Sequence, residues 1–117
     1  GVISNTLRSP GMVLGQILDR AGLVFKVLTF SDEYGIRKPD PKIFKLTLAR
    51  MGVAPEHAVH VGDDPLLDVE GPLEAGMGAI QLIPDGRATS PVKPDAVIRT
   101  LRELPTALKR VAATIVT

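Results

Sequence analysis

Apolar residues occur along this chain in two patterns, short continuous runs and positions three or four apart, and the two patterns alternate. The runs predict strands buried in a sheet, and the spaced positions predict amphipathic helices that cover it. The expected strands are Val2-Ile3, Val24–Phe30, Ala58–Val61, Ala79–Ile83 and a short one at Asp95–Ile98. The expected helices run from Pro10 to Ala21, from Pro41 to Gly52, from Pro65 to about Ala75, and onward from about Pro105.

Strands and helices follow one another in regular order, which is typical of an α/β fold with a parallel sheet covered on both faces. We therefore expect a Rossmann-like, three-layer α/β/α core that forms a single domain over residues 1–117. Ligands bind such sheets beyond the carboxyl ends of the strands. Polar pairs follow three of the predicted strands, at Ser4-Asn5, Ser31-Asp32 and Asp63-Asp64.

The segment His60–Met77, HVGDDPLLDVEGPLEAGM, places acidic side chains at one such strand end. Asp64 and the proline after it have the pattern of a helix N-cap followed by proline in the first helical position. Asp68 lies four residues later, so its carboxylate shares a helix face with that of Asp64. Together with Asp63 these carboxylates would converge, and their oxygens suit a hard cation such as Mg²⁺. The alternative is that Asp64 only caps the helix while Asp63 and Asp68 are solvated.

A lysine and a short polar turn lie at the same predicted edge. Lys38 precedes the helix that starts at Pro41, and its ammonium could neutralise charge developing on a phosphoryl group. Ser4 and Asn5 offer a hydroxyl, an amide and backbone N–H groups that can cradle a phosphate. The alternatives are a surface lysine and an ordinary turn. His60, inside an apolar strand, is expected to be a packed residue rather than a ligand.

Composition removes several classes of function. The 14 basic and 13 acidic residues give a net charge of +1 with no basic run, and aromatic residues make up only 3%. A nucleic-acid groove and a membrane-surface patch therefore have no support, and no apolar run is long enough to span a membrane. The absence of cysteine excludes a thiolate zinc site and a cysteine nucleophile, and it fits a reducing cytosol. We expect a cytoplasmic protein.

Three ordered segments, GVISN, KPDPKIF and HVGDDPLLDVEGPLEAGM, resemble the second, third and fourth motifs of the haloacid dehalogenase-like hydrolase superfamily. The likeness is to the phosphatase-type branch with a cap inserted near the N-terminus, and it runs from Gly1 to about Pro84. The acidic GDDPLLD resembles the phosphohydrolases more than the true dehalogenases. The resemblance implies a Rossmann-like core, Mg²⁺ as cofactor and a small phosphorylated substrate.

The resemblance also implies a role for each motif residue. Ser4 would hydrogen-bond the transferring phosphoryl group, assisted by the backbone of Asn5, and Lys38 would stabilise negative charge there. Asp63 would be the principal Mg²⁺ ligand, and Asp64 would contribute directly or through water. Asp68 would act behind them, orienting water or Lys38.

One departure from the family pattern is large. The first motif, a strand ending in Asp-x-Asp whose first Asp attacks phosphorus, does not occur in these 117 residues. In the family's sheet that strand lies between the Val2-Ile3 and Ala58–Val61 strands, and the cap would also lie upstream. Because the chain opens at Gly1 directly into an apolar pair, we expect that an upstream segment is missing.

These features predict the C-terminal part of a Mg²⁺-dependent phosphohydrolase that is inactive on its own. One alternative is a non-catalytic module that binds phosphate or metal. The other is a split enzyme, in which a partner chain inserts the central strand.

Overall fold

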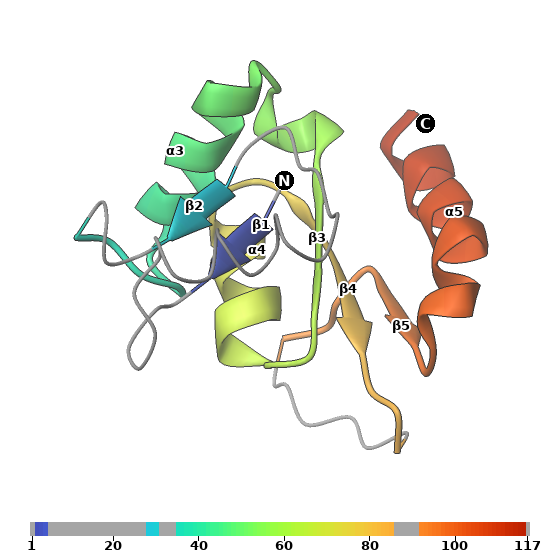
Figure 1. Cartoon of the computed structure of the whole chain (residues 1–117). Helices are drawn as coiled ribbons and strands as arrows, with labels where there is room; N and C mark the ends of the chain where they lie inside the picture. The colour runs from blue at the N-terminus through green and yellow to red at the C-terminus, as the bar shows by residue number, and fades with distance from the viewer. Residues whose placement is uncertain (1, 5–27, 31–34, 86–91, 117) are drawn as a thin grey trace, which may run out of the picture.

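Two parallel sheets and the helices packed on them make up the fold in a computed structural model of the chain (Figure 1). The structure describes residues 2–4, 28–30, 35–85 and 92–116. One sheet pairs β1 (Val2–Ser4) with β2 (Leu28–Phe30). The other has the order β3-β4-β5, formed by Val59–Gly62, Gly78–Leu82 and Ala96–Ile98.

Every strand pair is parallel, which confirms the predicted α/β class. Within the described residues, β1 and β3 have no hydrogen-bonded strand between them, so the sheet is split where a central strand was expected to be missing. In β3 all four residues are half-buried, whereas three of the five residues of its neighbour β4 are buried.

The helix α3 (Pro41–Met51) begins and ends as its sequence predicts. The Asp40 side chain accepts a hydrogen bond from the backbone N–H of Lys42 at 2.9 Å, and a proline takes the first helical position. Gly52 ends the helix with φ of 70°, a conformation that favours glycine. Ile3 of β1 packs against a core made of Ile43, Phe44, Leu48, Ala75 and Met77.

The helix predicted from Pro65 to about Ala75 is present, but it is not a regular α-helix. Leu66–Glu70 forms a π-helix, in which the N–H of Glu70 donates to the carbonyl oxygen five residues earlier, and only Gly71–Glu74 (α4) is α-helical. Pro72 explains the wider turn, because it has no N–H and its ring would clash with the carbonyl four residues earlier in a regular helix.

The last part of the chain forms a second core on β4 and β5. A short 3-10 helix, Leu101–Glu103, leads into α5 (Leu104–Val116), in agreement with the predicted last turn and C-terminal helix. The buried side chains of this core are Ile80, Ile98, Ala107 and Val111. Val59 and Val61 of β3 also pack against this core, so it holds β3, β4 and β5 together on one face of the sheet.

Some predicted elements fall wholly or partly outside the described residues. The helix predicted from Pro10 to Ala21 lies outside them, and only the last three residues of the predicted Val24–Phe30 strand are described. Among the helices that the structure describes, none is both long enough and apolar enough to cross a membrane.

Candidate active site

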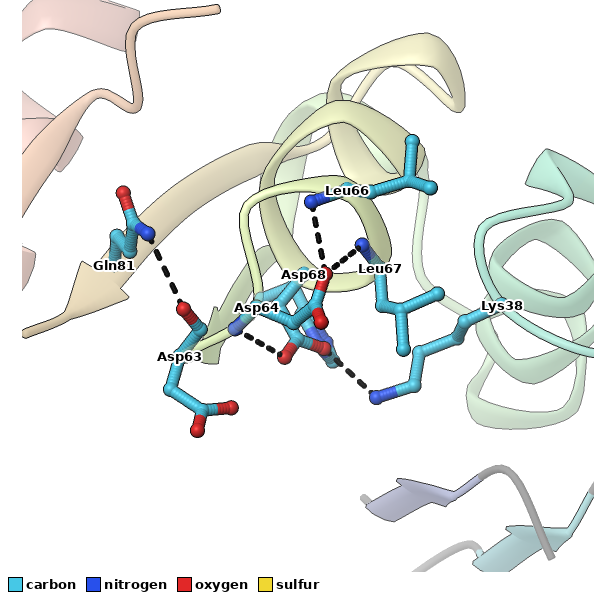
Figure 2. A network of polar contacts seen from close by, with 8 residues as sticks. Lys38, Asp63, Asp64, Leu66, Leu67, Asp68 and Gln81 are labelled. Atoms are coloured by element: carbon cyan, nitrogen blue, oxygen red, sulfur yellow. Dashed lines mark hydrogen bonds and ion pairs between the residues drawn. The ribbon is translucent and has the colours of Figure 1, made fainter. Parts of the chain in front are cut away.

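Asp68 is the centre of a polar network at the carboxyl end of β3 (Figure 2). It lies in the Leu66–Glu70 π-helix and is 5% exposed. Its Oδ1 accepts from the Lys38 ammonium at 2.7 Å and lies 2.9 Å from Nε2 of His60. Its Oδ2 accepts from the backbone N–H of Asp64 at 3.1 Å. One carboxylate therefore connects the loop before α3, strand β3 and the turn after it.

Two glycines allow this close packing. A Cβ at Gly62 would overlap the side chain of Asp68, so only glycine lets the carboxylate lie against the end of β3. A Cβ at Gly71 would lie 2.9 Å from both the Phe44 ring and the carbonyl oxygen of Pro39. The helical segment therefore packs directly on the residue after Lys38, which brings the lysine within reach of the carboxylate.

The partners of Asp68 keep it ionised. Burial alone would raise the pKa of Asp68, because it disfavours the charged form. Hydrogen bonds from His60 and Lys38, the charge of Lys38 and the N–H of Asp64 outweigh this effect and hold the pKa of Asp68 well below its ordinary range. The site thus contains a stable carboxylate–ammonium pair at neutral pH.

Asp64 caps the helix, as its position before a proline predicted. Its Oδ1 accepts from the backbone N–H groups of Leu66 at 2.9 Å and Leu67 at 2.8 Å. Asp63 is exposed, and its carbonyl oxygen accepts from the buried amide of Gln81 at 3.2 Å. Figure 2 shows the Asp63 carboxylate pointing away from the capped turn. No hydrogen bond or ion pair with another described residue is formed by that carboxylate.

The carboxylates do not converge in the way that the helix spacing predicted. The oxygens of Asp68 are taken by Lys38, His60 and a backbone N–H, so this carboxylate is neither part of a three-carboxylate cluster nor solvated. Among the residues described, no group of three or more histidine, aspartate or glutamate side chains could hold a metal. The carboxylate of Asp63 and the second oxygen of Asp64 are hard donors at one strand end.

Two carboxylates nevertheless fit one class of metal site. Mg²⁺ usually keeps several waters and is bound by one or two carboxylates together with substrate phosphate oxygens. Asp63 and Asp64 match that donor set in number and in chemistry. These two residues therefore remain compatible with Mg²⁺.

The other predicted site residues are placed only in part. Ser4 is the last residue of β1, but its side chain lies outside the described set, and Asn5 lies outside it entirely. His60 was expected only to pack, and its contact with Asp68 was missed. A signal for it exists, because alternation along β3 puts His60 on the same face as Gly62, against which Asp68 lies.

The chain is similar to known hydrolases over most of its length. The family model of haloacid dehalogenase-like hydrolase matches residues 1–76. A phosphoserine phosphatase of Thermus thermophilus is 42% identical over 87 residues, which are 72% of this chain and 35% of that protein.

Solved structures show the same similarity. A 2-haloacid dehalogenase of Pseudomonas syringae superimposes with a TM-score of 0.75 at 42% identity, covering 80% of this chain and 42% of its own. The hydrolase YfnB of Bacillus subtilis, bound to magnesium, superimposes with a TM-score of 0.80 at 27% identity, covering 91% and 47%. The chain spans less than half of each of these three proteins.

Proposed function

Because the chain belongs to the haloacid dehalogenase-like hydrolase family, we propose that it carries the phosphate-binding, lysine and metal-binding part of a Mg²⁺-dependent phosphatase for small phosphorylated metabolites. The observation that supports this most is the pairing of Lys38 with buried Asp68 beside the acidic end of β3. Phosphoryl transfer requires fixed positive charge together with carboxylates that can hold a cation; here Lys38 supplies the charge, and Asp63 and Asp64 at the end of β3 supply the carboxylates.

Lys38 would act on the phosphoryl group by electrostatics. Its ammonium has three N–H donors, and the bond to Asp68 uses one of them. The positive charge of this ammonium, held in place by that bond, can stabilise negative charge on phosphoryl oxygens without reorganising at the moment of reaction. We assign the phosphate hydrogen bonds to Ser4 and Asn5, as the family motif implies.

Asp63 and Asp64 would hold the metal. A bound Mg²⁺ would add positive charge next to the phosphoryl oxygens. The magnesium-bound state of YfnB, which shares this fold, supports the assignment. The adjacent acidic pair also favours phosphoryl transfer over dehalogenation, although a dehalogenase is among the similar structures. Action on a small phosphorylated substrate is supported by the phosphoserine phosphatase.

The acceptor carboxylate would come from a strand between β1 and β3. A pocket of about 90 Å³ lies between these two strands. Its lining is mostly apolar and comes from Ile3, Thr47, Leu48, Met51, Ala58, Val59, His60 and Met77. An apolar side chain of an inserted strand would fill such a site, while the backbone of that strand pairs with the open edge of β3. The same observation favours our second candidate, a split enzyme whose partner chain supplies the strand.

The first test is the in-frame coding sequence upstream of Gly1. A strand ending in Asp-x-Asp followed by a helical insert supports a continuous phosphatase, and a start codon close to Gly1 contradicts it. A start codon there, together with co-purification of a chain that restores activity, supports the split enzyme. The cytoplasmic location, the single-domain organisation over residues 1–117 and the lack of nucleic-acid or membrane partners stay predictions.

The second test is turnover. The purified 117-residue chain should show negligible phosphatase activity, and the chain joined to its upstream segment should hydrolyse phosphomonoesters such as phosphoserine when Mg²⁺ is present. Asp63→Ala should abolish that activity, whereas Asp85→Ala, three residues after the end of β4, should not. Turnover by the 117-residue chain alone that disappears in Asp63→Ala would contradict the proposal.

A further inference from the structure

His60 makes a contact in the site that the proposed roles do not use. Its Nε2 lies 2.9 Å from Asp68 Oδ1, the same oxygen that accepts from the Lys38 ammonium at 2.7 Å. The side chains of Lys38, His60 and Asp68 are 12%, 13% and 7% exposed. The three groups therefore form a compact, largely buried cluster in which one oxygen contacts two nitrogen atoms.

The imidazole ring also packs against a side chain of α3. The ring of Phe44, which is fully buried, meets His60 edge to face at a centroid distance of 5.2 Å and an angle of 78°. This packing restricts rotation of the imidazole and keeps Nε2 directed at the carboxylate. The ring of His60 is thus held in place on the sheet, whereas Lys38 has a long side chain on a loop.

The position of the Lys38 ammonium depends on where Asp68 Oδ1 lies. Apart from Lys38 itself, the Asp68 carboxylate has two anchors, the 2.9 Å contact with His60 and the longer 3.1 Å bond from the N–H of Asp64. Without the contact with His60, the carboxylate that binds the ammonium would keep only the longer bond from Asp64 as an anchor.

We propose that His60 is a positioning residue for Lys38: it donates its Nε2–H to Asp68 Oδ1 and so fixes the carboxylate to which the ammonium is bound. Its importance for catalysis rests on the proposed function, but the geometry is a property of the chain itself. A neutral imidazole has a single N–H, so this role requires the proton on Nε2, with Nδ1 as the acceptor.

The charged groups around His60 agree with this requirement. Asp68 faces it from the π-helix and Lys38 from the loop before α3, while Phe44 on α3 is uncharged. Asp68 Oδ1 accepts from the Lys38 ammonium at 2.7 Å and its Oδ2 accepts from the N–H of Asp64 at 3.1 Å, so both oxygens act as acceptors. A carboxylate can accept but not donate, so the proton in this bond comes from the ring.

The first test reads the tautomer by NMR of the chain labelled with ¹⁵N-histidine. The sequence has two histidines, and exposed His57 in the Pro55–His57 3-10 helix is an internal control. We expect His60 to carry a proton on Nε2 that exchanges slowly with water, and His57 to exchange fast. A proton on Nε2, alone or in an imidazolium, supports the proposal, and a proton on Nδ1 alone overturns it.

The second test reads Lys38 directly. Limited acetylation of the chain, followed by peptide mass spectrometry, compares Lys38 with exposed Lys42 on α3. His60→Phe keeps an aromatic ring beside Phe44 but removes the donor, and His60→Gln keeps an N–H donor. We expect the Lys38:Lys42 ratio to rise about fivefold in His60→Phe, the effect of losing a typical hydrogen bond, and to change little in His60→Gln. An unchanged ratio in a folded His60→Phe chain overturns the proposal.

Neither measurement needs turnover, so the two hypotheses can fail separately. If the completed enzyme lacks phosphatase activity while His60 shows the expected tautomer and protection of Lys38, the proposed function is wrong and the positioning role stands. If activity is found but the Lys38:Lys42 acetylation ratio does not respond to His60→Phe, the positioning role is wrong and the proposed function stands. If His60→Phe does not fold, the tautomer in the unsubstituted chain decides the question.

Discussion

A single buried carboxylate, Asp68, receives an ammonium, an imidazole and a backbone N–H from three different parts of the chain. Taking a carboxylate out of water costs several kcal/mol unless charge and hydrogen bonds compensate, and removing one partner leaves the others without compensation. The cluster is therefore a place where single substitutions have large effects. This property separates Asp68 from exposed Asp63, although the two lie five positions apart.

At this scale we predict that Asp68→Asn destabilises the chain by about 1–3 kcal/mol, because the half-buried Lys38 ammonium loses its counter-charge. The matched substitution Asp63→Asn removes an exposed carboxylate without a described partner and should change stability by less than about 0.5 kcal/mol. Urea unfolding of both variants at neutral pH without added metal measures the difference. Equal effects of the two substitutions would show that the Asp68 network contributes nothing.

Gly62 gives a second prediction for a single residue. Because an added Cβ overlaps the Asp68 side chain, Gly62→Ala should displace the carboxylate and cost about 1–3 kcal/mol, as expected for overpacking. In the double variant Gly62→Ala, Asp68→Gly the overlap is relieved. Asp68→Gly should therefore destabilise the Gly62→Ala chain less than it destabilises the unsubstituted chain. Additive effects in this double-mutant cycle, measured by urea unfolding, would contradict the steric explanation.

At the scale of secondary-structure elements, the helix caps are the main features. Two Asp-Pro pairs start helical segments here: Asp40 caps α3, and Asp64 caps the Leu66–Glu70 π-helix. Both carboxylates satisfy backbone N–H groups that would otherwise have no partner. They differ in surroundings, because Asp64 lies next to Asp63 at the end of β3.

This difference gives a paired prediction. Asp40→Ala and Asp64→Ala should each lower the free energy of unfolding by about 1 kcal/mol through loss of a cap. Only Asp64→Ala should also weaken Mg²⁺ binding, measured by titration of the chain and followed by NMR. If both variants bind Mg²⁺ as the unsubstituted chain does, Asp64 is a cap and not a ligand.

A glutamate at the start of the C-terminal helix should make the stability of the fold depend on pH. Oε2 of Glu103 accepts from the backbone N–H groups of Arg99 and Thr100, which together lower the pKa of Glu103 below its ordinary 4.5. A depressed pKa in the folded state stabilises the fold above pH 4.5, and this contribution is lost as the pH falls through the folded value. Thermal unfolding should therefore show that stability falls as the pH is lowered from about 6 to 3, and that it falls less in Glu103→Gln than in the unsubstituted chain. An identical pH profile in both chains would exclude this role.

For the whole molecule, the separation of β1 from β3 is the main structural feature. β3 has one sheet neighbour among the described residues, and the amides of a strand in a parallel sheet point alternately to its two sides. In the isolated chain, hydrogen exchange by NMR should show alternate β3 amides protected and the others fast, whereas the amides of β4 should all be protected. A segment that inserts between β1 and β3 should also protect the β3 amides that exchange fast in the isolated chain. Full protection of β3 in the isolated monomer would contradict an open edge.

Much of the fold could be predicted from the sequence because its signals are local. Asp40, Pro41 and Gly52 mark the ends of α3 within one turn of the helix, and the apolar runs mark the strands. The irregular helix after Asp64 was missed, because the effect of Pro72 on the preceding turn depends on how the segment packs. The contact of His60 was missed because strand periodicity gives the face of a side chain and not its partner.

The sequence by itself determined the order of the elements, the caps and the acidic residues at the end of β3, since each depends on neighbours within about four positions. Only the tertiary structure decided which of these acidic residues is buried among hydrogen-bond partners and which is exposed. Asp68 turns inward because Lys38, thirty residues earlier, and His60, eight residues earlier, are brought to it by packing against Gly62, Gly71 and Phe44. Which buried charge meets which donor depends on close packing between elements, and that packing is not contained in any local pattern.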